Sequence, residues 1–343
     1  MKKLIRFIII LSLLLGGIGA YFYYNIRIKS ITYFEEDFRY LYIKSTDDYN
    51  NVMASLEGGG IVGNTKLFDQ VAQLKSYPDL IKSGKYKIEN GLSAEALVNK
   101  LRSGDQVPVK LTFNNVRLKT ELAGKIAQQL ELDSLSVLNS LNDNSYMSKY
   151  GLKSSNSMVL FIPNTYEVWW DMSKEELFDR MAKEFKSFWN EERKAKARKI
   201  GLSQTEVTIL ASIVESEQRK LVAEWPKISG LYLNRLRKGM KLQSDPTVIY
   251  GIGDFSINRV LRKDLLHPSP YNTYMHKGLP PGIIRLPDSR AIDAVLNAEN
   301  HRYLYMCAKG DGSYEHRFAI SYSEHLRNAS NYQAELNKSK IYR

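Results

Sequence analysis

The run Ala211-Ser212-Ile213-Val214-Glu215-Ser216-Glu217 places two carboxyl groups at the end of an apolar segment. Ser203 and Glu206 precede it with the S-x-x-E spacing of a capping box, which predicts a helix that begins there. The apolar residues between positions 207 and 214 cover most of the circumference of this helix, so we expect it to be largely buried. A carboxyl group held against an apolar wall has a raised pKa, as a general acid requires.

The two acids lie on different sides of the expected helix. Glu215 falls on a narrow polar strip with Thr208 and Ser212, whereas Glu217 turns back toward the apolar side. We take Glu215 as the candidate catalytic acid. The alternative is that Glu215 caps the helix or pairs with an arginine, because structural ion pairs outnumber catalytic acids.

Polar and aromatic segments are concentrated after these acids. They are Asn234-Arg235-Leu236, Leu242-Gln243-Ser244-Asp245-Pro246-Thr247-Val248-Ile249-Tyr250-Gly251, Tyr271-Asn272-Thr273-Tyr274 and Gly278-Leu279-Pro280-Pro281-Gly282. Each segment alone has an ordinary explanation, such as a turn or a stiff proline corner. Together they supply tyrosine, asparagine and glutamine side chains on expected loops. We interpret this composition as that of a carbohydrate groove, with aromatic faces for sugar rings and amides for hydroxyl and acetamido groups.

These motifs, in this order and spacing, closely resemble those of the endolytic murein transglycosylases, the YceG-like family. The segment Phe161-Ile162-Pro163-Asn164-Thr165-Tyr166 is similar to the family's F-P-D-T-Y element, although Asn164 stands where Asp is common. Ser157-Met158-Val159-Leu160 also replaces the acidic residue and glycine that usually precede this element. The resemblance covers the chain from about residue 155 to its end.

The resemblance implies a lyase mechanism with Glu215 as the single catalytic residue. Glu215 would protonate the glycosidic oxygen between N-acetylmuramic acid and N-acetylglucosamine in nascent peptidoglycan strands, and would then accept the proton of the muramyl C6 hydroxyl. That hydroxyl attacks C1 and closes a 1,6-anhydro ring, which terminates strand elongation. Ordinary glycosidases use two carboxyl groups. A nucleophile tethered beside the reacting carbon removes that need.

The resemblance also implies the residues that bind substrate. It places Tyr271 and Asn272 beside the catalytic glutamate, where we expect them to orient the sugar and stabilise developing charge. Gln243 and Asp245 are further candidates that line the groove or support it.

Three residues have expected supporting roles. Glu217 matches a family acid, and we expect it to form a structural pair, with Arg235 as its candidate partner. His316 aligns with a family histidine near the C-terminus, with a supporting role at the site and a purely structural role as the two alternatives. The five histidines show no metal-ligand spacing, and the implied chemistry needs no metal or organic cofactor.

The N-terminus predicts a membrane anchor. Phe7 to Tyr24 is an uncharged, mostly apolar run, long enough to span a bilayer as a helix. The cations Lys2, Lys3 and Arg6 precede it and predict a cytoplasmic N-terminus. A cleaved signal peptide is the alternative. The net charge of +12 suits an anionic partner, and the membrane segment argues against nucleic acid.

The expected fold class is α+β. We expect a cytoplasmic stub and transmembrane helix (1–28), a small LysM-like α/β module (29–113), a helical connector (114–154) and a mixed α+β YceG-like catalytic domain (155–343). The LysM-like resemblance rests on Gly84-Lys85-Tyr86-Lys87-Ile88 and Leu101-Arg102-Ser103-Gly104. The lone Cys307 excludes an intrachain disulfide, and it lies in an apolar run that predicts a buried strand.

We therefore expect a single-pass protein of the cytoplasmic membrane whose catalytic domain lies outside, with peptidoglycan strands as substrate. Peptidoglycan synthases are the partners that the resemblance implies. Two alternatives stay open. A muramidase would use Glu215 with Asp245 or Glu217 and leave a reducing end. A wall-binding or divisome scaffold would carry Glu215 without using it.

Overall fold

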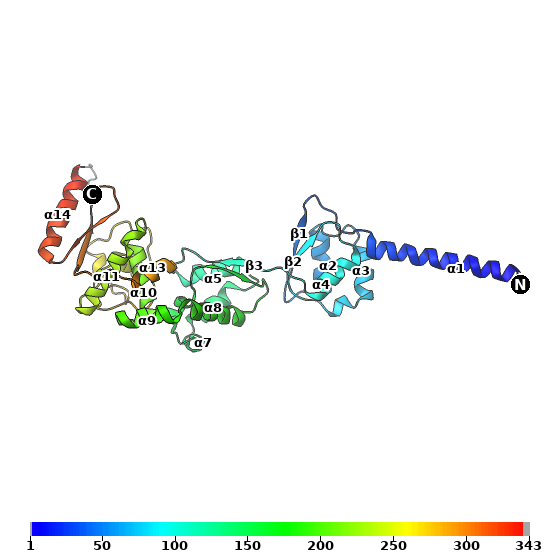
Figure 1. Ribbon diagram of the computed structural model, residues 1–343, viewed down its shortest axis with the longest axis horizontal. Coiled ribbons are helices and arrows are strands. Elements are labelled where there is room, and N and C mark those ends of the chain that lie inside the picture. Colours follow the sequence, from blue (N-terminus) through cyan, green and yellow to red (C-terminus); the bar gives the residue numbers. More distant parts are fainter. Residues whose placement is uncertain (1, 339–343) are drawn as a thin grey trace. The chain divides into compact units, whose positions relative to one another are not determined.

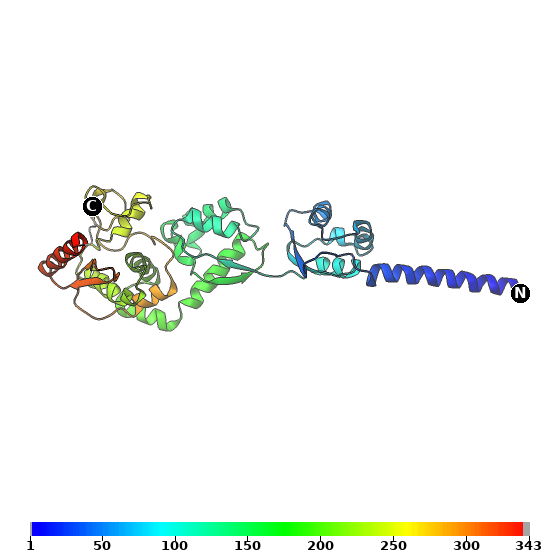
Figure 2. The ribbon, with the colours of Figure 1, turned by 90° about the horizontal axis from the view of Figure 1, so that it is seen from above.

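A computed structural model describes residues 2–338 of the chain. These residues form two compact units (Figures 1 and 2). Within the described residues, unit 1 comprises 2–111, 127–132 and 166–173, and unit 2 comprises 112–126, 133–165 and 174–338.

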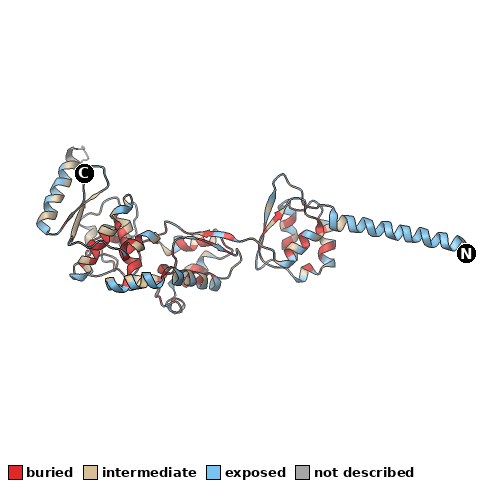
Figure 3. Ribbon diagram, viewed as in Figure 1, coloured by how far each residue is buried: buried red, intermediate tan, exposed pale blue. Residues whose placement is uncertain are grey.

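The chain begins with a long apolar helix, α1 (Lys2–Tyr23), which continues into one π-helical turn at Tyr24–Ile28. None of the side chains of α1 is buried, as its pale colour in Figure 3 shows. The segment Lys2–Ile28 has the length and mean hydropathy of a helix that crosses a membrane. The structure therefore supports the predicted span by length and composition.

Unit 1 is built on a two-stranded antiparallel sheet. Strand β1 (Phe38–Ile43) pairs with β2 (Gly84–Glu89) in the register Phe38↔Glu89 to Ile43↔Gly84. Alternate residues Leu41, Ile43, Tyr86 and Ile88 face inward and are buried. Three helices complete this core: α2 (Tyr49–Gly58), α3 (Thr65–Leu74) and α4 (Ala94–Ser103).

The remaining elements are short and mostly helical. They are β3 (Val109–Thr112), α5 (Lys119–Ala127), α6 (Ser134–Asn142), α7 (Asn144–Ser148), β4 (Thr165–Val168), α8 (Lys174–Phe188), α9 (Glu191–Ile200), α10 (Gln204–Glu217), α11 (Trp225–Arg237), α12 (Asp245–Ile252), α13 (Ser289–Leu296), β5 (Tyr305–Ala308), β6 (His316–Ala319) and α14 (Tyr322–Lys338). Strand β3 pairs with β4, and β5 pairs with β6 in antiparallel fashion.

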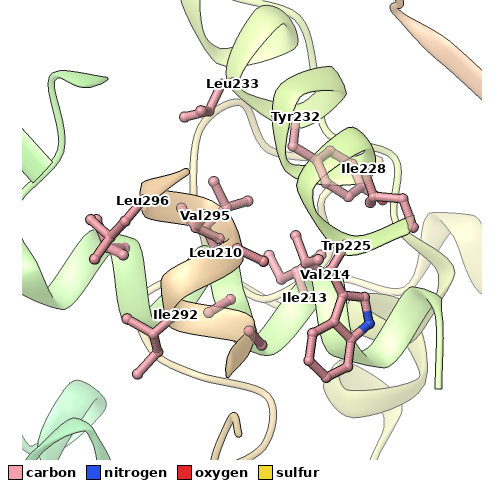
Figure 4. Packing of buried hydrophobic residues seen from close by; sticks show 14 of the residues in the cluster. Leu210, Ile213, Val214, Trp225, Ile228, Tyr232, Leu233, Ile292, Val295 and Leu296 are labelled. Atoms are coloured by element: carbon pink, nitrogen blue, oxygen red, sulfur yellow. The ribbon is translucent and has the colours of Figure 1, made fainter. Parts of the chain in front are cut away.

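Helix α10 is the centre of the core of unit 2. All eight residues from Val207 to Val214 are buried. Leu210, Ile213 and Val214 pack in one cluster with apolar side chains of α11 and α13 (Figure 4). The prediction of a largely buried helix is confirmed. The expected polar strip of α10 is also buried. Thr208 donates a hydrogen bond to the Gln204 carbonyl, and Ser212 donates one to the Ile209 carbonyl.

The α+β class with an N-terminal apolar helix is confirmed, while the LysM-like character of unit 1 stays a prediction.

Some elements differ from the sequence-based expectation. Helices α8 and α9 are separate because Asn190 caps a new helix. The segment Asp245–Ile252, expected as a loop, is helix α12 with Pro246 in its first turn. Cys307 lies in a strand, as predicted, but is only half-buried.

The packing of α10 predicts a large loss of stability in Leu210→Ala. Leu210 is fully buried, so truncation removes apolar contacts and leaves a cavity, at a cost of about 3 kcal/mol. Urea unfolding of the full chain in detergent, followed by tryptophan fluorescence, would measure it. The matched control is Leu135→Ala, because Leu135 is 59% exposed and should change stability little. Equal effects of the two substitutions would contradict the central role of α10.

Candidate active site

Glu215 and Glu217 line two different cavities on either side of the last turn of α10. The predicted capping box at the start of α10 is formed. The Ser203 hydroxyl accepts a hydrogen bond from the Glu206 N–H, and the Glu206 carboxylate accepts one from the Ser203 N–H. This cap and the buried face of α10 fix the direction in which each carboxyl group points. The cavity at Glu217 is called here the Glu217 pocket, and the cavity at Glu215 the Glu215 cleft.

The Glu217 pocket gathers most of the motifs found in the sequence. Its volume is about 260 Å³. Its walls come from α10, α11, the start of α12, the loop before α13 and strands β5 and β6. They are formed by Glu217, Leu231, Tyr232, Arg235, Leu242, Gln243, Asp245, Tyr274, Met306, Cys307, Ala308 and His316. Of the eight predicted site residues, five lie here: Glu217, Arg235, Gln243, Asp245 and His316.

The carboxyl group of Glu217 is held by two hydroxyl groups. Tyr232 donates a hydrogen bond of 2.6 Å to its Oε1, and Ser244 donates a second one to the same oxygen. Burial raises the pKa of Glu217, and the charge of Asp245 adds to this, while Ser244, Tyr232 and His316 oppose it. Both hydrogen bonds are made to Oε1 of Glu217, and the carboxyl group lines the pocket. An acid held in this way is already oriented before a ligand binds.

Asp245 and Gln243 face the same pocket. Tyr274 donates a hydrogen bond of 2.6 Å to Asp245 Oδ1, and desolvation by the pocket walls raises the pKa of Asp245. Gln243 has a φ of 54°, a left-handed conformation that is uncommon for a residue with a side chain. Such strain is typical of sites that the surrounding fold must hold in place. Here the Gln243 N–H donates to the Thr273 carbonyl, which ties the two motifs together.

Arg235 and His316 have structural partners. The guanidinium group of Arg235 donates to the carbonyls of Leu304, Lys241 and Leu242 and to Gln243 Oε1. The expected pair of Glu217 with Arg235 is therefore replaced by the bonds from Tyr232 and Ser244.

His316 Nδ1 lies 2.7 Å from Glu224 Oε2, within hydrogen-bond distance. Its backbone N–H also donates to Glu224 Oε1. These bonds join β6 to the start of α11 beside the pocket, so His316 both lines the pocket and fixes one of its walls.

Asn272 and Tyr271 lie elsewhere. Asn272 is fully buried, and its amide donates to the carbonyls of Leu265 and His267 and accepts from the Tyr274 N–H. This use of the whole amide favours a role in shaping the loop over direct contact with a sugar. Tyr271 packs against Tyr250, with ring centroids 4.6 Å apart, and lines neither of the two cavities.

The Glu215 cleft has a volume of about 520 Å³ and a different chemistry. Its walls include Asn114, Asn115, Pro163, Glu215, Arg219, Val222, Trp225, Arg285, Leu286, Asp288, Ser289 and Arg290. Arg285 Nε lies 3.3 Å from Glu215 Oε1, and the Asp288 N–H donates a bond of 2.6 Å to Oε2. Burial raises the pKa of Glu215, although Arg285 and the Asp288 N–H oppose this by favouring the charged form.

Sequence reasoning did not identify Tyr232, Ser244 and Tyr274 as parts of the site. Ser244 and Tyr274 stand inside motifs that were recognised, but their hydroxyls pair with acids that are distant in sequence. One signal could have favoured Glu217 over Glu215. Its position on the apolar side of α10 was visible in the helical periodicity, and that side is where a carboxyl group is desolvated most.

Comparisons with known proteins decide the family. The profile of the YceG-like family matches residues 41–331. The chain belongs to the YceG-like family. A crystal structure of a putative YceG-like protein from Listeria monocytogenes is similar, with a TM-score of 0.56, 25% identity, and coverage of 85% of this chain and 98% of the other.

Two curated relatives carry the name endolytic murein transglycosylase. The protein of Bacillus subtilis (strain 168) is 28% identical over 312 residues, which are 86% of this chain and 85% of the relative. The protein of Streptococcus pneumoniae serotype 2 (strain D39 / NCTC 7466) is 27% identical over 343 residues. That match covers 89% of this chain and 60% of the relative. The prediction of an enzyme of the lytic transglycosylase class, a lyase, is confirmed at the level of family and named relatives.

The raised pKa of Glu217 predicts how Glu217→Gln changes the dependence of stability on pH. The folded protein binds the Glu217 proton more tightly than the unfolded chain, so wild type loses stability as pH rises above the ordinary value of 4.5. The glutamine variant lacks this loss and should gain stability relative to wild type over that range. Urea midpoints measured at several pH values would test it, with exposed Glu57→Gln as control. A difference between variant and wild type that is constant with pH would contradict it.

Proposed function

We propose that this protein is an endolytic peptidoglycan lytic transglycosylase that cleaves the bond between N-acetylmuramic acid and N-acetylglucosamine. The observation that carries the proposal is the Glu217 pocket. A buried, oriented carboxyl group meets polar side chains of three recognised motifs there, in a chain of the YceG-like family. The names of the relatives support peptidoglycan as the substrate.

The contacts support Glu217, rather than the expected Glu215, as general acid and base. Glu215 faces a guanidinium group and accepts a backbone N–H, and both stabilise its charged form and so weaken it as a proton donor. Among residues 2–338, Glu217 accepts hydrogen bonds only from the neutral hydroxyl groups of Tyr232 and Ser244, and it lies at the wall of the pocket that holds Asp245 and Gln243. Glu215 remains the second candidate for the acid.

The proposed reaction has two proton transfers. Protonated Glu217 gives its proton to the glycosidic oxygen as the bond from that oxygen to C1 of the muramyl residue breaks. The resulting carboxylate accepts the proton of the muramyl C6 hydroxyl, whose oxygen bonds to C1 and closes the 1,6-anhydro ring. Tyr232 and Ser244 stabilise the carboxylate between these steps, because their hydroxyls already donate to Oε1. Cleavage of a nascent strand in this way terminates its elongation.

A muramidase is a second candidate function, favoured by one observation. Asp245 lines the same pocket as Glu217, and a second carboxyl group could activate water. Desolvation raises the pKa of Asp245. The hydrogen bond that Tyr274 donates to its Oδ1 opposes this shift and makes the carboxylate a weaker base. Only the reaction products distinguish the two functions.

The remaining proposals concern the setting of the enzyme. Segment α1 would anchor the chain in the cytoplasmic membrane, and Lys2, Lys3 and Arg6 would keep the N-terminus in the cytoplasm and the catalytic unit outside. The domain limits 1–28, 29–113, 114–154 and 155–343, the LysM-like module and the association with peptidoglycan synthases belong to this proposal. A membrane position at the outer face would bring the pocket close to newly made strands.

Product analysis with matched variants tests the proposal. The full chain in detergent would be incubated with uncrosslinked glycan strands, and the products identified by mass spectrometry. We expect 1,6-anhydro ends from wild type and a fall in kcat of about 10²-fold to 10⁴-fold in Glu217→Gln, since a general acid contributes that much. Glu215→Gln should keep most of kcat.

The other outcomes have distinct meanings. Loss of cleavage in Glu215→Gln but not in Glu217→Gln would return the catalytic role to Glu215. Reducing ends that disappear in Asp245→Asn would establish the muramidase. Strand binding without cleavage by wild type would favour a scaffold.

A further inference from the structure

The proposed chemistry at Glu217 does not use the Glu215 cleft, which contains an unusual concentration of positive charge. A smaller hollow of about 140 Å³ adjoins the cleft and shares Arg219 and Arg285 with it. Arg117 also lines this hollow. The two hollows together are called here the arginine cleft. Arg290 and Asp288 at its edge neutralise each other through an ion pair of 2.7 Å.

Three guanidinium groups in the arginine cleft therefore face one carboxylate, that of Glu215. Burial lowers the pKa of Arg285, and the positive charges of Arg219 and Arg117 lower it further, whereas Glu215 raises it. Arg219 and Arg117 therefore each lie close enough to Arg285 for their charges to repel it. Repulsion between like charges at short range destabilises the folded protein, and a bound anion relieves it.

The cations also have unused hydrogen-bonding capacity. Arg219 is exposed and makes no hydrogen bond or ion pair within the described part of the chain. Arg285 is 5% exposed, and its buried Nε makes no hydrogen bond despite its ion-pair contact with Glu215. Its Nη2 is fixed by a bond of 2.7 Å to Asn115 Oδ1. Arg285 is thus held in place by Glu215 and Asn115.

The walls of the cleft fit a substituted glycan better than a free ion. Trp225 and Pro163 provide apolar surface, and Asn114 and Asn115 provide amides, over a volume of about 520 Å³. Arginine is the side chain best suited to bind a planar carboxylate through two parallel hydrogen bonds. Glu215 in the cleft and Glu217, the proposed catalytic residue, both lie on the final turn of α10.

We propose that the arginine cleft binds the carboxylate groups carried by the peptide stems of the glycan strand, and that Arg219 is the residue that contacts them. This inference rests on the proposed function, because the strand is the ligand. Binding there anchors the substrate and does not take part in proton transfer. Arg219 therefore contributes to KM and leaves kcat unchanged.

Kinetics of Arg219→Gln on two forms of one substrate test the inference. The full chain in detergent would act on uncrosslinked strands with intact stem carboxylates and on the same strands after the carboxylates are converted to methylamides. We expect Arg219→Gln to raise KM about fivefold on intact strands, with kcat unchanged, since a charge-assisted hydrogen bond is lost. On amidated strands the variant and wild type should have equal KM. Arg302→Gln, at an exposed arginine outside the cleft, is the control.

Several results would overturn the inference. KM that is unchanged in Arg219→Gln, or raised equally on both substrates, would exclude carboxylate recognition by this residue. A fall in kcat alone would assign Arg219 to the chemistry instead. Inhibition by pyrophosphate, lost in Arg219→Gln, without any dependence on strand carboxylates would assign the cleft to phosphate.

A binding measurement separates this inference from the proposed function. In the Glu217→Gln background, fluorescent strands report affinity without cleavage. Weaker binding of intact strands on adding Arg219→Gln, with no change for amidated strands, supports the inference even if wild type proves not to cleave. Arg117→Gln provides a second variant in the same hollow, where the Arg117 guanidinium lies over the Phe255 ring, 4.7 Å from its centroid. Equal binding by all variants would overturn the inference.

Discussion

The desolvation of one carboxyl group at the end of α10 is the constraint on which the site depends. Glu217 is held in an apolar setting by a helix whose residues 207–214 are all buried, so its position cannot change without disturbing the core. Burying a carboxyl group is unfavourable unless hydrogen bonds compensate it. Tyr232 from α11 and Ser244 before α12 supply these bonds, and the chain between them must therefore be arranged around the acid.

The motif around Gln243 and Asp245 illustrates this arrangement. Ser244 can reach Glu217 only if the chain turns sharply at Gln243, which adopts a φ of 54°. Two neighbouring bonds stabilise the turn, one from the Gln243 N–H to the Thr273 carbonyl and one from the Ser244 N–H to the Thr273 hydroxyl. The strained residue, the acid and the 271–274 segment thus form one unit, and the strain is a consequence of delivering a hydroxyl to a buried carboxyl group.

The sequence predicted the elements of this site better than their assembly. The helix with its capping box, the strand β5 and the family were predictable, because caps, apolar runs and ordered motifs are local signals. The choice between Glu215 and Glu217 was not, because it depends on which side of α10 meets Tyr232 and Ser244. Asn272 shows the same limit. Its amide suggested contact with a sugar, but three backbone groups of its own loop use it fully.

The two acids of α10 are two residues apart, about 200° around a helix, so one turn presents carboxyl groups to two cavities with different linings. Two hydroxyl groups donate to Glu217 Oε1, and burial raises its pKa although these bonds oppose the shift. Burial also raises the pKa of Glu215, but Arg285, Arg219 and the Asp288 N–H favour its charged form, and its carboxyl group in turn orients Arg285. If one residue had to serve both purposes, stabilising its charge for binding would lower the pKa that acid catalysis requires. Separation of the two carboxyl groups across the helix removes that conflict, and it explains why a rigid, capped and fully buried α10 connects both cavities.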